Sequence, residues 1–336
     1  MSANTQGIIR NGELENGLEL IKQPLSSYAD VYDRIFRAVP VIDEKGDFVR
    51  IGGGFGSEVN VGDFLRAPGG KYNEIDVSYT AVTGWRLNDV GLASKVDKRQ
   101  LRVQGGGSSR RLNLQQDSLN LMIQELAIAR SFIGLSMLVG GTITNNAAMT
   151  ATRFDDDATD IQAVVSAQVS AFEDQEGISP NKGAIRIDVA RALSKHAKLV
   201  ENWSRTQRSM GRIVSVRNKA GLEAFVADLF GLDECVVVNA RYNTANAGQT
   251  AAQGLMWADS MVLYYDQAVL SPRTPNAALV RYQGTEDGAT ATGGRFMNGE
   301  VMEWEDRYNI YNSVSYDEQY SVPRVGLARL LTDCVA

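Results

Sequence analysis

Side chains suited to catalysis or metal binding are sparse and scattered in this sequence. His196 is the only histidine, and it lies beside lysines in a stretch with a helical pattern, a position typical of a surface or helix-end residue. Cys235 and Cys334 are isolated, and neither a CxxC pair nor an HxxxH pair occurs. Because metal sites need such ligands at short, fixed spacings, we predict no catalytic residues, no cofactor site and no metal site.

Two other motifs lack the residues that would make them binding loops. The run Asp155, Asp156 and Asp157 has no glycine turn and no distal glutamate of the kind that a calcium loop needs, which favours a solvated acidic loop. The stretch IGGGFG at 51–56 does not fit the GxGxxG pattern, and no strand–helix–strand pattern surrounds it. We interpret it as a flexible loop, and we predict that the protein is not an enzyme.

The composition indicates a folded protein without a strong affinity for nucleic acid. The chain has 336 residues, of which 44% are hydrophobic and 22% charged, and its formal net charge is -6. One large domain or two modest ones are both compatible with this length, and phosphate binding would need a basic excess. Cys235 lies inside an apolar run, and no secretory signal is visible, so we expect free thiols and a cytoplasmic location.

One long helix is predicted from Arg110 to Val139, and we expect the rest of the chain to be arranged around it. It contains no proline, and Gly140 and Gly141 follow it. Its apolar residues form two rows on opposite sides, so we expect cover on both sides, from its own domain and from another domain or subunit. One row is Leu112, Leu119, Leu126 and Ile133, and the other is Leu114, Leu121, Ile128 and Leu135.

Two alternatives compete with this interpretation of the long helix. A transmembrane span needs about 20 apolar residues. The apolar run from Leu126 to Val139 is too short for that, and Arg130 interrupts it. An ordinary core helix of a large globular domain stays open as the second alternative.

Two segments before the helix have too little apolar area to fold alone. Residues up to about 45 are predicted to form an extended arm that ends in a short amphipathic helix, from Tyr28 to Phe36. The stretch from 45 to 107 favours a long two-stranded projection with a mobile tip, and we expect both segments to rest on neighbouring subunits. The projection has a local basic excess, suited to intersubunit pairing with acidic patches, although a solvated charged loop is the alternative. Its basic residues are Lys71, Arg86, Lys95, Lys98, Arg99 and Arg102.

The segments after the helix alternate between helical and strand patterns. Helices are predicted at 161–176, 184–203 and 218–230, and buried strands at 235–238 and within 255–265, which implies a compact α/β domain from about 182 to 280. From Met302 to Val322 the apolar residues share even positions, which predicts one or two long antiparallel strands with one buried face. We expect this face to pack on the long helix.

In this order of parts the chain resembles the major capsid proteins of tailed bacteriophages, which share the Hong Kong ninety-seven fold. Local stretches resemble one branch of that family: 158–196, with its turn at Pro180, and 229–249 followed by 255–282, with Trp257 before the buried strand. The resemblance implies an α+β fold with an N-terminal arm at 1–45, an extended β loop at 46–107, a peripheral domain with a spine helix at 108–181, an axial domain at 182–282 and closing peripheral strands at 283–336.

The same resemblance implies a major head protein of a virion. Such a protein self-assembles in the host cytoplasm into hexamers and pentamers of an icosahedral shell, which contacts packaged double-stranded DNA non-specifically and no membrane. Scaffolding, portal and decoration proteins are the further partners that it implies. Some family members crosslink a lysine of the extended loop to an asparagine of a neighbour, and Lys71, Lys95 and Lys98 lie in that segment, but no acceptor asparagine is marked.

Three alternatives stay open from the sequence. An encapsulin shell that encloses a cargo enzyme shares the fold. An α/β enzyme with a Tyr, Asp or Ser nucleophile within 182–280 is a second alternative, and a phage tail or decoration protein is the third.

Overall fold

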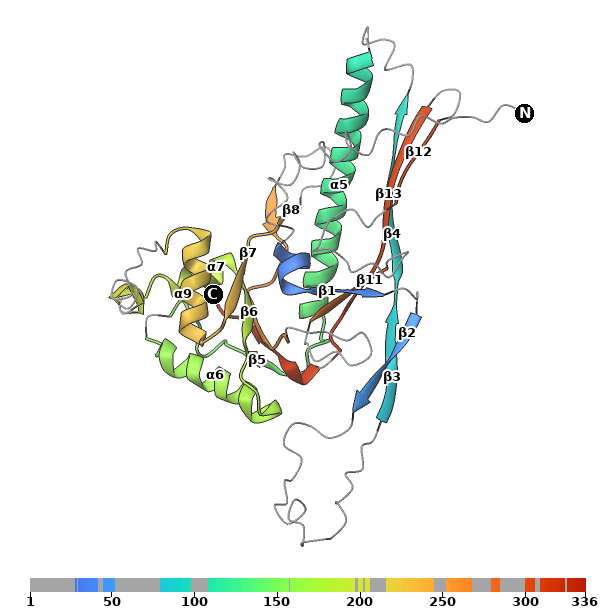
Figure 1. Cartoon of the computed structure of the whole chain (residues 1–336). Helices are drawn as coiled ribbons and strands as arrows, with labels where there is room; N and C mark the ends of the chain where they lie inside the picture. Colours follow the sequence, from blue (N-terminus) through green and yellow to red (C-terminus); the bar gives the residue numbers. More distant parts are fainter. Residues whose placement is uncertain are drawn as a thin grey trace, which may run out of the picture.

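A computed structural model describes the central elements of the chain. The residues that it describes are 28, 30–41, 45–51, 79–97, 108–156, 158–196, 199–201, 203–205, 216–244, 252–267, 279–284, 300–305, 309–323 and 325–336. Within them, a long helix lies between two β-sheets, and three shorter helices cover the far side of one sheet (Figure 1).

The first sheet contains the longest strand that the structure describes, β13 (Asn309–Ser321). Its order is β1 (Arg37–Val41), β11 (Val280–Gly284), β13 and β12 (Glu300–Glu305), and β4 (Asn88–Asp97) pairs with β13 as well. β1 runs parallel to β11, and the other pairs are antiparallel. The prediction of one or two long antiparallel strands between 302 and 322 is therefore confirmed, with β13 as the long strand and the six-residue β12 beside it.

The long helix is α5 (Ser108–Val139), 32 residues in one piece, as predicted. It ends at the predicted glycine pair, because the Gly140 N–H donates to the Ser136 carbonyl at 2.8 Å and Gly141 has φ +80. The helix lies along the first sheet, where the hydroxyl of Ser94 in β4 donates to that of Ser118 at 3.3 Å. The predicted packing of this helix on the closing strands is confirmed, because α5 also contacts β13.

The second sheet has the order β5 (Asn146–Ala148), β14 (Ala328–Thr332), β10 (Met261–Tyr264), β6 (Lys182–Arg186) and β7 (Glu234–Val238). β6 runs parallel to β7, and β5 runs parallel to β14. Three helices lie on one face: α6 (Ile161–Glu176), α7 (Ile187–Leu193) and α9 (Lys219–Phe230). Asp160 and Asn218 cap the starts of α6 and α9, and Gly177 and Gly231 end them in the left-handed conformation.

Apolar residues of the second sheet alternate between two cores, which explains its continuously apolar strands. In β7, Val236 and Val238 join the core that contains α5, whereas Cys235 and Val237 join the core beneath α6, α7 and α9. β10 alternates in the same way. The predicted burial of these strands on both faces is confirmed, and the layers follow as first sheet, α5, second sheet and helices (Figure 1).

The predicted helix at 184–203 is wrong in its first part and in its continuity. Ala184 and Ile185 belong to β6, which pairs with both β10 and β7, so sheet pairing overrides a helical spacing of apolar residues. α7 then lasts only seven residues, and a turn at 194–195 follows it. Helical backbone returns at 199–201 and 203–205.

The predicted two-stranded projection is confirmed for 45–51 and 79–86 but not for 88–97. β2 (Lys45–Ile51) and β3 (Tyr79–Arg86) form an antiparallel pair, and Gly46 allows the ring of Trp85 to lie against the backbone. β4 does not continue this ribbon, because it pairs with β13 from Asn88 to Asp97 and so gains the sheet contacts that an isolated ribbon would lack. The predicted mobile tip lies outside the described residues. A second small hairpin joins β8 (Arg241–Asn243) to β9 (Gln253–Leu255).

Candidate functional site

Three of the residues that were weighed for chemistry from the sequence lie around Phe154, because His196 and Cys334 contact its backbone and Asp155 follows it. The His196 Nε2 atom lies 2.7 Å from the Phe154 carbonyl oxygen, at the turn after α7. Asp155 and Asp156 accept backbone N–H groups from Ala336 and Ala158, each at 3.0 Å. Over the described ranges, no group of three or more His, Cys, Asp or Glu side chains is placed to hold a metal ion. Most of the 51–56 motif, Lys71 and Lys98 lie outside these ranges, and Lys95 is exposed on β4.

The two cysteines are buried and free. Burial raises the pKa of the Cys334 thiol to about 12, and the nearby Asp259 carboxylate adds to the effect. Burial also raises the pKa of Cys235, with a further contribution from Glu223. Both thiols are therefore protonated and shielded in the folded protein.

We expect an aromatic disulfide reagent to modify neither cysteine in the native protein at about pH 8, and both after unfolding.

The same burial predicts a pH dependence of stability. Folded Cys334 keeps its thiol proton at pH values above 9.0, the ordinary pKa at which the unfolded thiol loses it. The free energy of unfolding should therefore fall as the pH rises above that value. Urea titrations at about pH 8 and about pH 10.5 measure this, and a higher urea midpoint at the alkaline pH would contradict it.

The arm segment, which we define as residue 28 with residues 30–41, contacts both sheets, as α5 does. It comprises the short π-helix η1 (Asp30–Ile35) and β1. Val31, Tyr32 and Phe36 are at most 1% exposed and belong to the core that α5 shares with the second sheet. The predicted short amphipathic helix is thus confirmed, but the prediction that the arm rests on a neighbouring subunit is wrong for these residues. They find their apolar cover in β13 and α5 of the same chain, segments that are remote in the sequence.

A buried cluster of charges joins the arm segment to α5 and the first sheet. The Arg130 guanidinium of α5 donates to the Glu318 carboxylate of β13, at 3.0 Å from Nε and 2.6 Å from Nη2. Arg281 of β11 donates to Asp33 of the arm segment at 3.2 Å, and its Nη1 atom lies 3.9 Å from Glu318. Two cations and two anions thus lie close together, three of them buried and Asp33 27% exposed, and each carboxylate pairs with a guanidinium.

Two tyrosines complete this cluster. The Arg130 guanidinium lies 4.3 Å from the ring centroid of Tyr32, and that of Arg281 lies 5.6 Å from it, so one aromatic ring of the arm segment contacts two cations. The Tyr320 hydroxyl donates to Glu318 at 3.1 Å. Burial raises the pKa of both phenols and of the Asp33 carboxyl, although Arg281 acts in the opposite direction on Asp33. Both tyrosines therefore stay neutral hydrogen-bonding groups.

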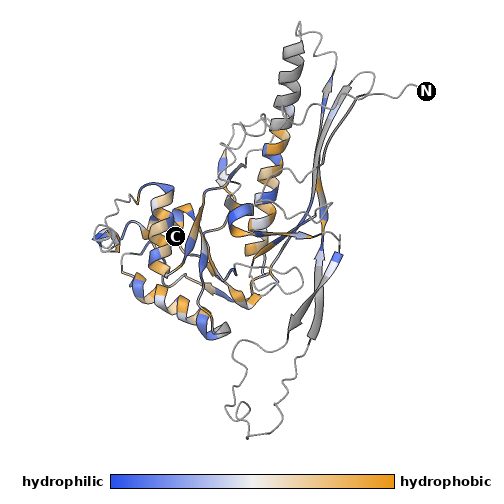
Figure 2. Ribbon diagram, in the orientation of Figure 1, coloured by the Kyte–Doolittle hydropathy of each residue, from blue (hydrophilic) through white to orange (hydrophobic). Residues whose placement is uncertain are grey.

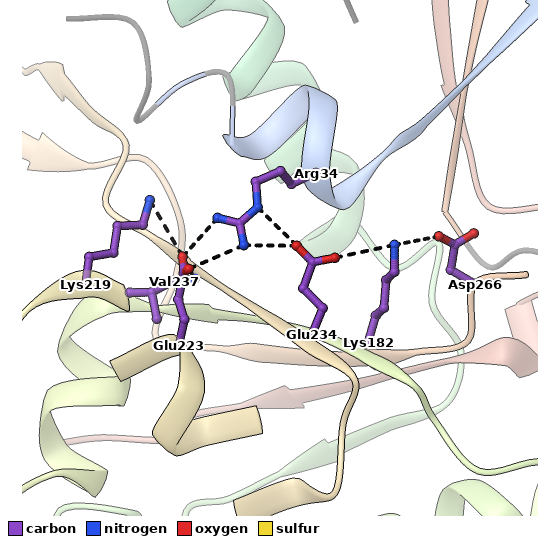
Figure 3. Close-up of polar contacts among 7 residues, drawn as sticks. All are labelled: Arg34, Lys182, Lys219, Glu223, Glu234, Val237 and Asp266. Carbon is purple, nitrogen blue, oxygen red and sulfur yellow. Dashed lines mark hydrogen bonds and ion pairs between the residues drawn. The ribbon is translucent and has the colours of Figure 1, made fainter. Parts of the chain in front are cut away.

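A second, more exposed set of ion pairs joins the arm segment to the second sheet and α9 (Figure 3). Arg34 of η1 contacts Glu223 of α9 at 3.1 Å and Glu234 of β7 at 2.9 Å. Lys219 lies 3.9 Å from Glu223, and Lys182 lies 3.6 Å from Glu234. Lys182 also pairs with Asp266 at 2.8 Å. The seam between the arm segment and the second sheet is therefore a line of alternating charges.

The described part of α5 is rich in hydrophobic residues (Figure 2). Several of its large apolar side chains are exposed. Leu121 is 60% exposed, Phe132 48%, Ile133 41% and Val139 39%. Phe132 contacts the ring of Tyr242 in β8, with centroids 6.1 Å apart. We call Leu121, Phe132, Ile133 and Val139 the exposed apolar surface.

The two predicted heptad rows do not divide α5 into a core side and an assembly side. Leu126 and Leu135 are each 1% exposed, yet they come from different rows, and each row also contains an exposed residue, Ile133 or Leu121. Burial instead follows steps of four residues, through Met122, Leu126, Arg130, Gly134 and Leu138. At about 100° per residue, a four-residue step turns the buried strip by about 40°, against about 20° in the opposite direction for a heptad, so the buried strip winds round the helix and crosses both rows. Leu112, Leu114 and Leu119 lie outside the described side chains.

The stretch Leu121–Val139 is long and apolar enough to cross a membrane by length and composition alone, which corrects the argument that it is too short. Half of this stretch is buried against the rest of the protein. Arg130, in its middle, is 3% exposed and paired with Glu318. These contacts are those of a helix inside a globular core.

The sequence analysis noticed Arg130 only as an interruption and missed Glu318 and Arg281 entirely. A signal existed at two of these positions. Arg130 stands within an apolar run, and Glu318 shares the even positions of Tyr320 and Val322, so both carry a charge where the pattern predicts burial. The pairing itself joins residues 188 positions apart, which no local pattern indicates.

Comparisons with solved structures show that this architecture is the α+β fold of phage capsid proteins. A phage-related protein from Bordetella bronchiseptica RB50 is 19% identical and superposes with a TM-score of 0.60, covering 93% of this chain and 96% of that one. The capsid protein of cyanophage P-SCSP1u is 13% identical with a TM-score of 0.50, over 89% of this chain and 86% of that chain.

Another similar structure is the SrpI encapsulin of Synechococcus elongatus PCC 7942. It is 11% identical, has a TM-score of 0.49, and covers 90% of this chain and 87% of its own. No protein-family model matches the sequence, and no curated protein does either. At these identities the likeness shows the fold.

Proposed function

We propose that this protein is the major capsid protein of a tailed bacteriophage. Many copies would form the hexamers and pentamers of an icosahedral shell around double-stranded DNA. The observation that carries the proposal is the fold, which matches a cyanophage capsid protein over 89% of this chain. The role is structural, with no enzymatic step.

The arrangement of elements fits a subunit that must make several different contacts. Closed shells form when heterologous contacts repeat around closing rotations, so each subunit needs more than one interface. The exposed apolar surface of α5 is one candidate, because large apolar side chains grouped on a helix mark sites of association.

In this proposal, α5 and the first sheet form the peripheral domain, and the second sheet with α6, α7 and α9 forms the axial domain. The division into five segments stays a prediction. Two strands of the second sheet come from segments that the sequence analysis assigned to the peripheral domain, namely β5 at 146–148 and β14 at 328–332.

The net charge of -6 suits a shell that must release its DNA, because a strongly basic inner wall would bind phosphate tightly. We therefore propose non-specific, weak contact with the DNA, a location in the virion and assembly in the host cytoplasm. Scaffolding, portal and decoration proteins are the partners that such a shell would recruit.

Electron microscopy of the purified protein tests this function. We expect closed shells of uniform diameter, and nucleic acid inside the particles made during infection. Shells that contain a cargo enzyme and no DNA would instead identify an encapsulin. Assembly into tubes would identify a tail protein, and binding only to preformed shells would identify a decoration protein. A monomer with an open pocket would support the alternative of an enzyme.

Substitutions of two leucines in α5 separate assembly from folding. Leu121→Ser should change the free energy of unfolding by less than about 0.5 kcal/mol, because the side chain is 60% exposed, and should reduce shell yield. Leu126→Ser, at 1% exposure, should cost about 2–5 kcal/mol. Urea titration and sedimentation of both variants measure the two effects. Equal losses of stability, with no specific loss of assembly, would mean that the α5 surface is only part of the core.

A further inference from the structure

We infer that the arm segment is an interdomain tie with two unequal ends. One end is anchored in the first sheet and α5, and the other rests on the second sheet through buried apolar side chains and an outer set of ion pairs that salt can release. Ionic strength would then set how firmly η1 is held on the second sheet. This inference concerns the single subunit and does not depend on what the shell contains.

The anchored end combines a β-ladder with buried charges. β1 pairs in parallel with β11 from Arg37 to Val41. The side chains of Arg130 and Glu318 are 4% and 2% exposed, and that of Arg281, which holds Asp33, is 1% exposed. Phe36 packs edge-on against Tyr320 with ring centroids 4.9 Å apart. Only Asp33, whose side chain is 27% exposed, offers water and counterions access to these contacts, so salt screens them less than it screens pairs in which both charges are exposed.

The releasable end, which we call the clasp, consists of Arg34 with Glu223 and Glu234. The side chains of Arg34 and Glu234 are 33% and 37% exposed, so dissolved ions can screen their attraction. Glu223 is 16% exposed and is fixed in place by the N–H of Val237, which donates to it at 3.1 Å. The clasp therefore has a fixed, partly shielded half and an open half.

Neighbouring lysines lower the free-energy cost of separating Arg34 from Glu223 and Glu234. If Arg34 leaves, Lys219 stays 3.9 Å from Glu223 and Lys182 stays 3.6 Å from Glu234, so neither acid loses all of its positive neighbours. The opposite holds at the anchor, where removing Arg130 from Glu318 would leave a carboxylate buried without its main partner. The two ends thus differ in what remains after separation as well as in exposure.

Hydrogen exchange of the full chain, measured by mass spectrometry at about 0.05 M and about 1 M NaCl, tests the inference. In the wild-type protein, exchange of amides 30–36 should speed up about three- to tenfold at high salt, while amides 37–41 in β1 stay unchanged. Arg34→Gln should show the faster exchange already at low salt and no further response. Arg34→Lys, which keeps the charge, should retain a salt response.

The matched control is Arg205→Gln. Arg205 forms an exposed ion pair with Glu201 at 2.5 Å, remote from the arm segment. Its replacement should therefore leave the exchange of amides 30–36 as in the wild type. An equal salt response of amides 30–36 and 37–41 would overturn the inference. So would a wild-type salt response in Arg34→Gln. The wild-type comparison decides the question even if a variant fails to fold.

Discussion

Replacing Glu318 by Gln is expected to lower the free energy of unfolding by about 3–5 kcal/mol. Glu318 is 3% exposed and accepts hydrogen bonds from Nε and Nη2 of Arg130 and from the hydroxyl of Tyr320. An amide keeps one acceptor oxygen and turns an NH₂ group toward a guanidinium. The buried Arg130 charge would then lack its counterion, and that unpaired charge is the main cost.

Urea titration followed by circular dichroism measures this loss, with Glu201→Gln as the control. Glu201 pairs with Arg205, but its side chain is 60% exposed, so the control should change stability by less than about 1 kcal/mol. A double variant, Arg130→Met with Glu318→Leu, should lose less than the sum of its single variants, since removing both charges leaves neither one buried alone. A Glu318→Gln protein as stable as the Glu201→Gln control would contradict this account of the cluster.

Replacing Phe36 by Ala is expected to lower the free energy of unfolding by about 3–5 kcal/mol. Phe36 is fully buried and packs against Tyr320. The backbone of α5 approaches it at Gly134, where an added Cβ would lie 3.1 Å from the ring. Such close packing leaves little room for the surroundings to collapse into the cavity, which places the cost toward the upper end.

Phe132→Ala is the matched control, because it removes the same side chain from α5 at a site that is 48% exposed. It should cost about 1 kcal/mol or less, mostly from the lost contact with Tyr242. Calorimetry of both variants gives the difference. If Phe36→Ala lost as little stability as Phe132→Ala, the arm segment would not be an essential part of the core.

Periodicity predicted the elements that are long or buried on one defined face. α5, the strands between 302 and 322, and β7 all follow from spacing and length in the printed sequence. The prediction failed where long-range pairing decides the structure. β6 replaces the start of a predicted helix because two strands flank it, and β4 leaves the predicted ribbon because β13 offers ten further residues of ladder.

The candidate site was harder to predict than the fold. Each charged residue of the cluster lies in a different helix or strand, and its charge is neutralised only by partners that are distant in the sequence. Arg130 within an apolar helix and Glu318 on an apolar strand face each indicate burial. Only the tertiary structure shows that the two charges neutralise each other. Arg34 carries no such signal, because an exposed arginine near the end of a short helix is common.

The arm segment also bears on the order in which the chain can fold during synthesis. β1 leaves the ribosome early, yet its partner β11 lies 243 positions later along the register, and Tyr320, which covers Phe36, comes later still. Until those segments emerge, α5 and β7 can cover Val31, Tyr32 and Phe36 only in part, which makes the nascent chain prone to aggregation. Contacts of such high sequence separation also slow folding. Complete burial of the arm segment is therefore a late event, which requires synthesis to have passed residue 320.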